Sequence, residues 1–253
     1  MLPNNMSANR QGNMSGRPSR RHKFIRRLLL FRQMDFELAM WEMLNLCIAP
    51  SKVYRNITYH KQTKNQWARD DPAFLVLLAG CLCITSVGFS VYFWFPWWKL
   101  LSFALWVILF DCVVIGCIIS TAGWHLSNKY LRLETPHTTD EKVEWGYCFD
   151  IHCNSFFPLV LILHVLQLVL MPLLNKQTFI SVFLADTLYL CAVSSYIYIT
   201  FLGYSTLPFL GNTVALLFPA VAMLGTYIMC ILLQINLTTT VLYMYGIEST
   251  GPQ

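Results

Sequence analysis

The stretch Tyr54–Phe74, YRNITYHKQTKNQWARDDPAF, separates two parts of the chain that differ in character. Residues 1–72 hold 13 Lys and Arg against 5 Asp and Glu, whereas residues 73–253 hold 5 against 8. After Pro72 the sequence is almost wholly apolar and carries no charged side chain until Lys99. A basic segment that ends at a long apolar run is typical of a cytosolic arm joined to a membrane domain, with this stretch as the hinge.

The composition of the whole chain favours a protein that is solvated mainly by lipid. Of its 253 residues, 56% are apolar and only 12% are charged, which is about half the charge of an average soluble domain. The first apolar run of sufficient length begins at Ala73. A cleaved signal peptide is therefore not expected, and the first membrane helix should direct the chain to the membrane.

Five segments after the hinge reach the length of about 20 residues that a transmembrane helix needs. They are residues 73–95, 100–123, 156–174, 179–201 and 213–237. The sequence therefore predicts an all-α, polytopic membrane protein with five transmembrane helices over 73–237. Short turns should make helices one and two, and three and four, antiparallel neighbours, and residues 124–155 should form a cytosolic loop.

The Lys and Arg residues set the expected orientation. If the N-terminal arm is cytosolic, that side receives all but two of the 18 Lys and Arg, and the other side holds only Lys99 and Lys176. Cytosolic loops carry an excess of these residues in membrane proteins. With five spans, the tail over 238–253 is then expected in the lumen.

The N-terminal arm, residues 21–72, follows a tail over 1–20 that lacks apolar periodicity and is expected to be disordered. Basic residues that alternate with apolar ones lie at their junction: Arg17, Arg20, Arg21, Lys23, Arg26 and Arg27. This pattern favours contact with an anionic membrane surface, and contact with RNA is the rival interpretation. Helical spacing of apolar residues in 33–46 predicts an amphipathic helix that lies on the bilayer or against the bundle.

Three ionisable residues interrupt the predicted membrane helices, namely Asp111, His164 and Asp186. A charged side chain in hydrocarbon is costly unless it is paired, so these residues should face inward, with Gln167 and Gln234 as further partners. Two interpretations remain open. The three residues form a proton relay or substrate path in a small transporter or channel, or they form a buried hydrogen-bond network that fixes the helix register.

Motifs of enzymes and cofactor sites are absent from the sequence. It contains no H-E-x-x-H, G-x-S-x-G or phosphate-binding glycine loop, so we expect neither a catalytic residue nor a cofactor. Cys148, His152, Cys153 and His137 do not have the spacing of a common zinc module, so no metal site is expected. Each of the nine cysteines falls in a predicted span or cytosolic segment, which argues against a disulfide.

Motifs on both sides of the hinge resemble those of a known family. The resemblance is carried by HKQTKNQWARDDPAF at 60–74 and by FRQMDFE at 31–37. Further matches are SNKYL at 127–131, VEWGY at 143–147, YITFLGYS at 198–205 and LPFL at 207–210. Together these residues resemble the UNC-fifty (uncoordinated) family of Golgi membrane proteins.

The resemblance implies a non-enzymatic protein of Golgi and early secretory membranes that acts in vesicular transport. It implies a role in the cell-surface expression of receptors such as nicotinic acetylcholine receptors, and Arf guanine-nucleotide exchange factors as partners. For some members it also implies the inner nuclear membrane and RNA binding. It transfers no catalytic residue to this chain.

These two lines of argument give one hypothesis about the cytosolic face. We expect the helix over 33–46, the segment 54–71 and the loop over 130–152 to dock trafficking machinery. Exposed basic and aromatic residues are the usual anchors of such a surface, and here they are Arg55, Tyr59, Lys61, Lys64, Trp67 and Arg69. The alternative is that the segment only packs against the ends of its own helices.

Overall fold

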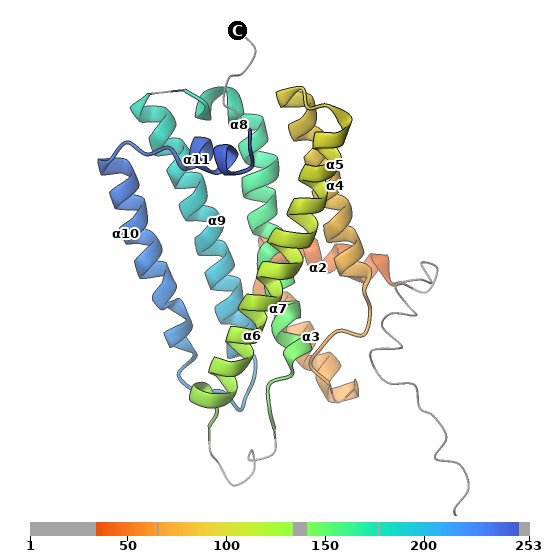
Figure 1. Cartoon of the computed structure of the whole chain (residues 1–253). Coiled ribbons are helices and arrows are strands. Elements are labelled where there is room, and N and C mark those ends of the chain that lie inside the picture. The colour runs from red at the N-terminus through yellow and green to blue at the C-terminus, as the bar shows by residue number, and fades with distance from the viewer. Residues whose placement is uncertain (1–33, 65, 134–140, 177, 248–253) are drawn as a thin grey trace, which may run out of the picture.

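Helices make up almost all of the regular structure (Figure 1). The computed structural model describes residues 34–64, 66–133, 141–176 and 178–247. Within these residues, β-structure is limited to an isolated bridge between Arg132 and Leu210. The predicted all-α fold is therefore confirmed.

Five long helical segments are apolar enough to cross a membrane, as predicted. The first is α4 (Ala73–Phe93), and the fourth is α9 (Phe179–Ser205). The second runs without a break through α5 (Trp97–Trp106), the π-helix η2 (Val107–Val114), α6 (Ile115–Leu126) and the π-helix η3 (Ser127–Leu131). The third is made of α7 (Trp145–Val160), the π-helix η4 (Leu161–Leu166) and α8 (Gln167–Leu174), and the fifth of η5 (Thr213–Leu217) and α10 (Phe218–Leu232).

The second and third segments are longer than predicted. They cover Trp97–Leu131 and Trp145–Leu174, because much of the loop expected over 124–155 is helical. Hydropathy detects only the part of a helix that lies in lipid, so the polar continuation of each helix was missed. At 1.5 Å per residue, the second segment is about 50 Å long, whereas the hydrocarbon core is about 30 Å thick.

The extra length projects from one end of the bundle. At the other end, sharp turns join α4 to α5 and α8 to α9. In the first turn Trp94 adopts left-handed backbone angles, with φ of 53°, and Pro96 is the N-cap residue of α5. Both turns lie at the same end of the bundle (Figure 1). The surplus turns of these two segments are therefore at the opposite end of the bundle (Figure 1).

Two further helices, α2 (Phe36–Ile48) and α3 (Pro50–Lys64), pack at this opposite end, which we call the α2–α3 end. Helix α2 packs against α4 and α7, and α3 packs against α9. The amphipathic helix predicted over 33–46 is α2, and it lies against the bundle. Its buried residues are Ala39, Glu42, Met43 and Leu46, while the apolar side chains of Met40 and Leu44 are exposed.

The chain after the fifth span differs from the expected luminal tail. Helix α10 stops at Leu232 rather than near residue 237, and α11 (Leu237–Met244) then lies across the bundle (Figure 1). Asn236 caps α11 by accepting from the Thr239 N–H at 3.2 Å, and its amide donates to the Leu174 carbonyl at 2.9 Å. This end of the molecule is called the α11 end.

Close contact between α6 and α7 depends on Gly116. A methyl group added at Gly116 would lie 2.6 Å from two atoms of the His152 ring, and α6 and α7 form one of the larger helix contacts of the bundle. The ring of His152 is held in place by Nε2, which donates to the Cys112 carbonyl at 3.1 Å. A His152 ring displaced by an added methyl group would lose this hydrogen bond.

We expect Gly116→Ala to lower the thermal unfolding temperature of the detergent-solubilised protein. Overpacking of this kind costs about 1–3 kcal/mol. The matched control is Gly80→Ala in α4, where an added methyl meets nothing within 4 Å and alanine is the better helix former. Equal unfolding temperatures for the two variants would show that the contact between α6 and α7 is not tight at Gly116.

Candidate functional site

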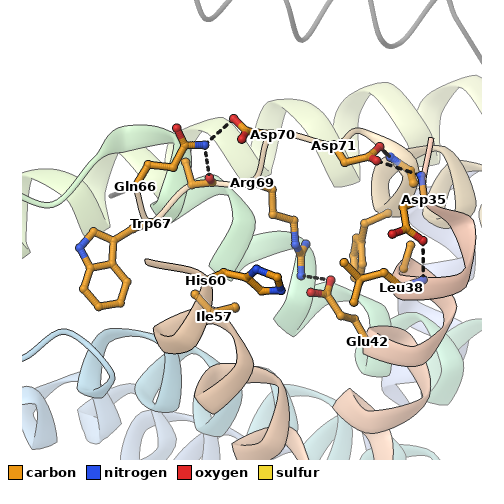
Figure 2. Close-up of a pocket in the computed structure, with 14 residues that line it drawn as sticks. Asp35, Leu38, Glu42, Ile57, His60, Gln66, Trp67, Arg69, Asp70 and Asp71 are labelled. Carbon is orange, nitrogen blue, oxygen red and sulfur yellow. Dashed lines mark hydrogen bonds and ion pairs between the residues drawn. The ribbon is translucent and has the colours of Figure 1, made fainter. Parts of the chain in front are cut away.

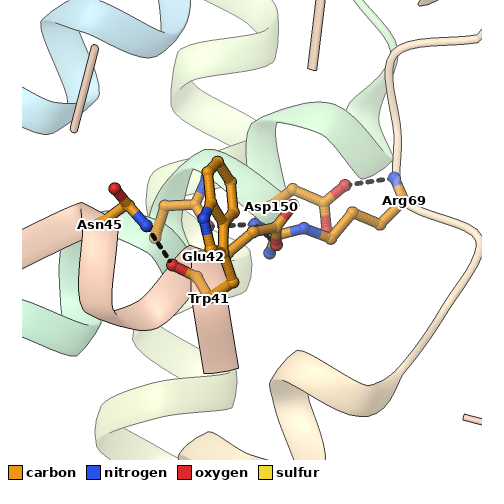
Figure 3. A network of polar contacts seen from close by, with 6 residues as sticks. Trp41, Glu42, Asn45, Arg69 and Asp150 are labelled. Carbon is orange, nitrogen blue, oxygen red and sulfur yellow. Dashed lines mark hydrogen bonds and ion pairs between the residues drawn. The ribbon is translucent and has the colours of Figure 1, made fainter. Parts of the chain in front are cut away.

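The α2–α3 end is held together by Arg69, which lies in the segment between α3 and α4 (Figure 3). Its Nη2 atom lies 2.8 Å from Oε2 of Glu42 in α2 and 2.6 Å from Oδ1 of Asn154 in α7. Its backbone N–H donates to Oδ2 of Asp150 at 2.7 Å. The guanidinium carbon also lies 4.2 Å from the centroid of the Phe74 ring at the start of α4. One residue therefore joins three helices.

The ion pair between Arg69 and Glu42 is largely shielded from water, with side chains 14% and 8% exposed. Burial disfavours the guanidinium charge, but the surrounding acidic and ionisable groups, led by Glu42 and Asp150, together raise the pKa of Arg69. A buried ion pair contributes to stability only when further hydrogen bonds satisfy its members. Nη2 supplies both polar contacts of the guanidinium, to Glu42 and to Asn154, whereas Nε and Nη1 are buried without a hydrogen-bond partner among the described residues.

Two aspartates fix the starts of α2 and α4 relative to each other. Asp35 caps α2 by accepting from the Leu38 N–H at 2.9 Å. Asp71 accepts from the Ala73 N–H at 3.0 Å with one oxygen and from the Asp35 N–H at 2.9 Å with the other. The segment that precedes the first membrane helix is thus bonded at both Arg69 and Asp71.

A pocket of about 290 Å³ lies among these groups (Figure 2). Asp35, Glu42 and Asp71 supply acidic groups to its wall, and Ile57 and Trp67 supply apolar surface. Among the described residues, no group of three or more His, Cys, Asp or Glu is placed to hold a metal ion. The carboxylates mainly accept hydrogen bonds from the protein's own backbone and from Arg69.

Helix α3 presents part of the predicted docking surface. Its apolar side, with Val53, Tyr54 and Ile57, is buried. Arg55 is exposed, and the Tyr59 side chain is 64% exposed. The predicted anchor Lys61 is half-buried, and its Nζ atom lies 5.4 Å from the centroid of the Trp67 ring. The side chain of Lys64, another predicted anchor, lies outside the described residues.

The expectation that Trp67 and Arg69 are exposed anchors is wrong. Trp67 is only 7% exposed, and its ring packs on Tyr147 and Phe209 at centroid distances of 5.8 and 6.5 Å. Both residues stabilise the packing of 66–72 on the bundle. For these two positions the alternative holds, in which the segment packs against its own helix ends.

The three intramembrane residues are partnered separately. Asp111 accepts from the Tyr245 hydroxyl at 2.6 Å, and Nδ1 of His164 lies 3.4 Å from the Thr85 hydroxyl. Asp186 is fully buried and accepts from the Leu237 N–H at 3.0 Å, at the start of α11.

The predicted trio is therefore divided between two places. Asp111, His164 and Gln167 line one cavity, and Asp186 is not among the residues of its wall. Gln234, named as a further partner, is exposed and donates to the Ile231 carbonyl at 3.1 Å. The basic cluster is outside the described residues, so membrane or RNA contact by it stays a prediction; its members are Arg17, Arg20, Arg21, Lys23, Arg26 and Arg27.

Comparison with known proteins decides the family. The model of the UNC-50 family matches residues 24–246. The chain belongs to the UNC-50 family. A zebrafish (Danio rerio) relative, "Protein unc-50 homolog", is 48% identical over 257 residues, covering 97% of this chain and 98% of its own length.

Other UNC-50 relatives are similarly close. The human (Homo sapiens) "Protein unc-50 homolog" is 49% identical over 228 residues, covering 90% of this chain and 87% of its own length. The Drosophila melanogaster relative of the same name is 48% identical over 207 residues, covering 81% and 74%. No solved structure matches. The resemblance drawn from the motifs is thus confirmed, and this is a multi-pass membrane protein of a family for which no enzyme function is indicated.

The partners of Arg69 in this UNC-50 protein were not identified from the sequence. Glu42 lies on the buried side of α2, between Ala39 and Leu46. An acidic residue among apolar ones on one helix face is the feature of the sequence that indicates a buried partner. Asp150 and Asn154 are four residues apart and so share one face of α7. A charged residue on an apolar helix face generally requires a buried partner of opposite charge.

Replacing Arg69 with Met should detach α2 from the bundle. The change leaves Glu42 buried without its cation, which costs about 3–5 kcal/mol. Hydrogen exchange of the protein in lipid nanodiscs should show faster exchange over residues 36–48. The control is Lys52→Met on the exposed surface of α3, which should change stability by less than about 0.5 kcal/mol.

A double substitution makes the test specific to the ion pair. Glu42→Gln removes the charge that Arg69 neutralises, so Arg69→Met combined with Glu42→Gln should be less damaging than the sum of the two single changes. Strict additivity, or unchanged exchange of α2 in Arg69→Met, would contradict the role given to this pair.

Proposed function

We propose that this UNC-50 protein docks trafficking machinery on the cytosolic side of Golgi and early secretory membranes through its α2–α3 end. In this role it supports vesicular transport and the surface expression of receptors such as nicotinic acetylcholine receptors. The partners we propose are Arf guanine-nucleotide exchange factors. Membership of the family supports this role, because the same resemblance that identified the family implies it.

The observation that carries the proposal is the ordered, basic helix α3. Its sequence, PSKVYRNITYHKQTK, contains four Lys and Arg and no Asp or Glu. It is anchored through Val53, Tyr54 and Ile57, and so it holds Arg55 and Tyr59 at the surface in a fixed arrangement. Preorganised arginine and tyrosine side chains lose little entropy on binding, and they are enriched among interface hot spots.

The proposed cytosolic orientation rests on the distribution of charge. Lys129, Arg132 and Lys142 lie in or beside the helical extensions that project at the α2–α3 end, whereas Lys99 and Lys176 lie at the turns of the α11 end. The excess of Lys and Arg at the α2–α3 end supports its placement in the cytosol.

Two exposed changes on α3 test the docking surface. We expect Arg55→Glu with Tyr59→Ala to abolish labelling of Arf exchange factors by a proximity-labelling enzyme fused to the N-terminus in intact cells. Loss of each hot-spot side chain costs about 2 kcal/mol or more of binding free energy, and the reversed charge repels an acidic partner. Neither side chain is needed for the Arg69 cluster, so insertion and stability should be unchanged.

The matched control reverses one charge at the same end of the molecule, away from α3 and outside the loop over 130–152. Lys129→Glu changes an exposed residue and should keep the labelling. Full labelling by the α3 variant, with both variants correctly localised, would contradict this surface. Equal loss in both variants would indicate a general effect of charge rather than docking on α3.

A further inference from the structure

A cavity of about 660 Å³ lies inside the membrane-spanning part of the bundle. Its wall is formed by residues of α6, α7, α9 and α10, and α11 with Tyr245 contributes the wall toward the α11 end. Most of the lining is apolar. The polar side chains are few, and the principal ones are Asp111, His152, His164, Gln167, Tyr196 and Tyr245. This size and this composition are those of a binding site for one small molecule.

Hydrogen bonding divides the polar side chains into occupied and available groups. Nε2 of His152 donates to the Cys112 carbonyl, and its Nδ1 is paired with the Tyr196 hydroxyl at 2.8 Å, so both nitrogens are used. The Tyr245 hydroxyl donates to Oδ2 of Asp111. Within the described residues, the second oxygen of Asp111 has no such partner.

His164 offers a second available acceptor. The Thr85 hydroxyl donates its proton to the Leu82 carbonyl at 3.1 Å. In the neutral tautomer in which Nδ1 carries the proton and donates to the Thr85 hydroxyl, Nε2 is an acceptor without a described partner. The cavity thus contains two acceptors, on Asp111 and His164, that suit a ligand with a hydrogen-bond donor.

Both acceptors stand on distorted helices. Asp111 lies in the π-helix Val107–Val114 and His164 in the π-helix Leu161–Leu166. π-helical turns are rare, and they occur frequently at functional sites. A third π-helix, Ser127–Leu131, does not contribute to the cavity, so the distortion alone does not define the site. The relevant observation is that both intramembrane acceptors, Asp111 and His164, lie in π-helices and line the same cavity.

The position of α10 indicates where a ligand would enter. Helix α10 packs mainly against α9 and η5, and only 6% of the most apolar window of this span is buried. The cavity is lined by Ile115 and Ile119 of α6 on one side and by Ala222 and Thr226 of α10 on the other. Since α6 is not a main packing partner of α10, the route between them faces the lipid.

We propose that this cavity binds one membrane lipid of the sterol type, with a single hydroxyl group on a compact apolar body. The hydroxyl donates to Asp111 or His164, and the apolar body fills the space between α6, α9 and α10. Tyr245 already shows that Asp111 accepts from a hydroxyl in this place. A two-chain phospholipid is too large for the cavity, and its phosphate would lie near Asp111 without a Lys or Arg in the cavity wall.

Photocrosslinking of the full chain in nanodiscs tests the proposal. A photoreactive sterol should label peptides of α6 and α10, and unlabelled sterol should compete. A ketone in place of the hydroxyl keeps the shape but cannot donate, so it should compete about fivefold more weakly or worse. In Asp111→Asn, which offers an amide N–H, the preference for the alcohol over the ketone should shrink.

A cavity-filling variant supplies the matched control. Ala222→Phe places a ring in the cavity and should remove the labelling, while Val221→Phe on the exposed side of the same helix should leave it intact. Because both positions lie on a helix with little buried surface, both variants should fold; thermal unfolding checks this. Equal labelling of the two variants, a ketone that competes as well as the alcohol, or stronger competition by a photoinert sphingoid amine would each overturn the proposal.

Discussion

The buried cation of Arg69 is the interaction on which the α2–α3 end depends. It lies where the polar arm meets the first membrane helix, and it gives α2, α4 and α7 a common contact. Without it, α2 would bring Glu42 to the bundle with no counter-charge, and α3 would be a polar helix held by a few apolar residues. The basic surface of α3 therefore owes its fixed position to a charge that is itself hidden from any partner.

A second constraint comes from lipid, in which every backbone polar group must be satisfied within the protein. This requirement explains why five continuous helices, and no irregular segments, cross the apolar region. It also explains how α10 can expose large apolar side chains such as Phe218, Val221 and Leu232 along its length. In a bilayer these side chains can contact lipid and need no protein partner. Helix α10 is therefore loosely packed, and the cavity of about 660 Å³ lies beside it.

Much of the membrane domain could be predicted from the sequence, because hydropathy and length report directly on the requirement of the bilayer. The polar ends of the second and third segments could not, since a helix in water carries no hydropathy signal. Arg69 was assigned to the surface because charged residues are usually exposed; its partner Asp150 is 81 residues away, and no local pattern reports such a pairing. Asp111 and His164 could be named from the sequence as ionisable residues within predicted spans, but Tyr245, the partner of Asp111, comes from a segment expected to be a tail.

The bond between Tyr245 and Asp111 has a consequence for the timing of synthesis. The two residues are 134 positions apart in the chain, and translation proceeds at about 5–20 residues per second. Asp111 must therefore enter the membrane on the order of 10 s before its hydroxyl partner has been made. During that interval the second span carries a carboxyl group that lacks its partner Tyr245. A chain whose synthesis stops before Tyr245 would leave this carboxyl group without its hydroxyl partner inside the bilayer, where an unpaired charge is costly.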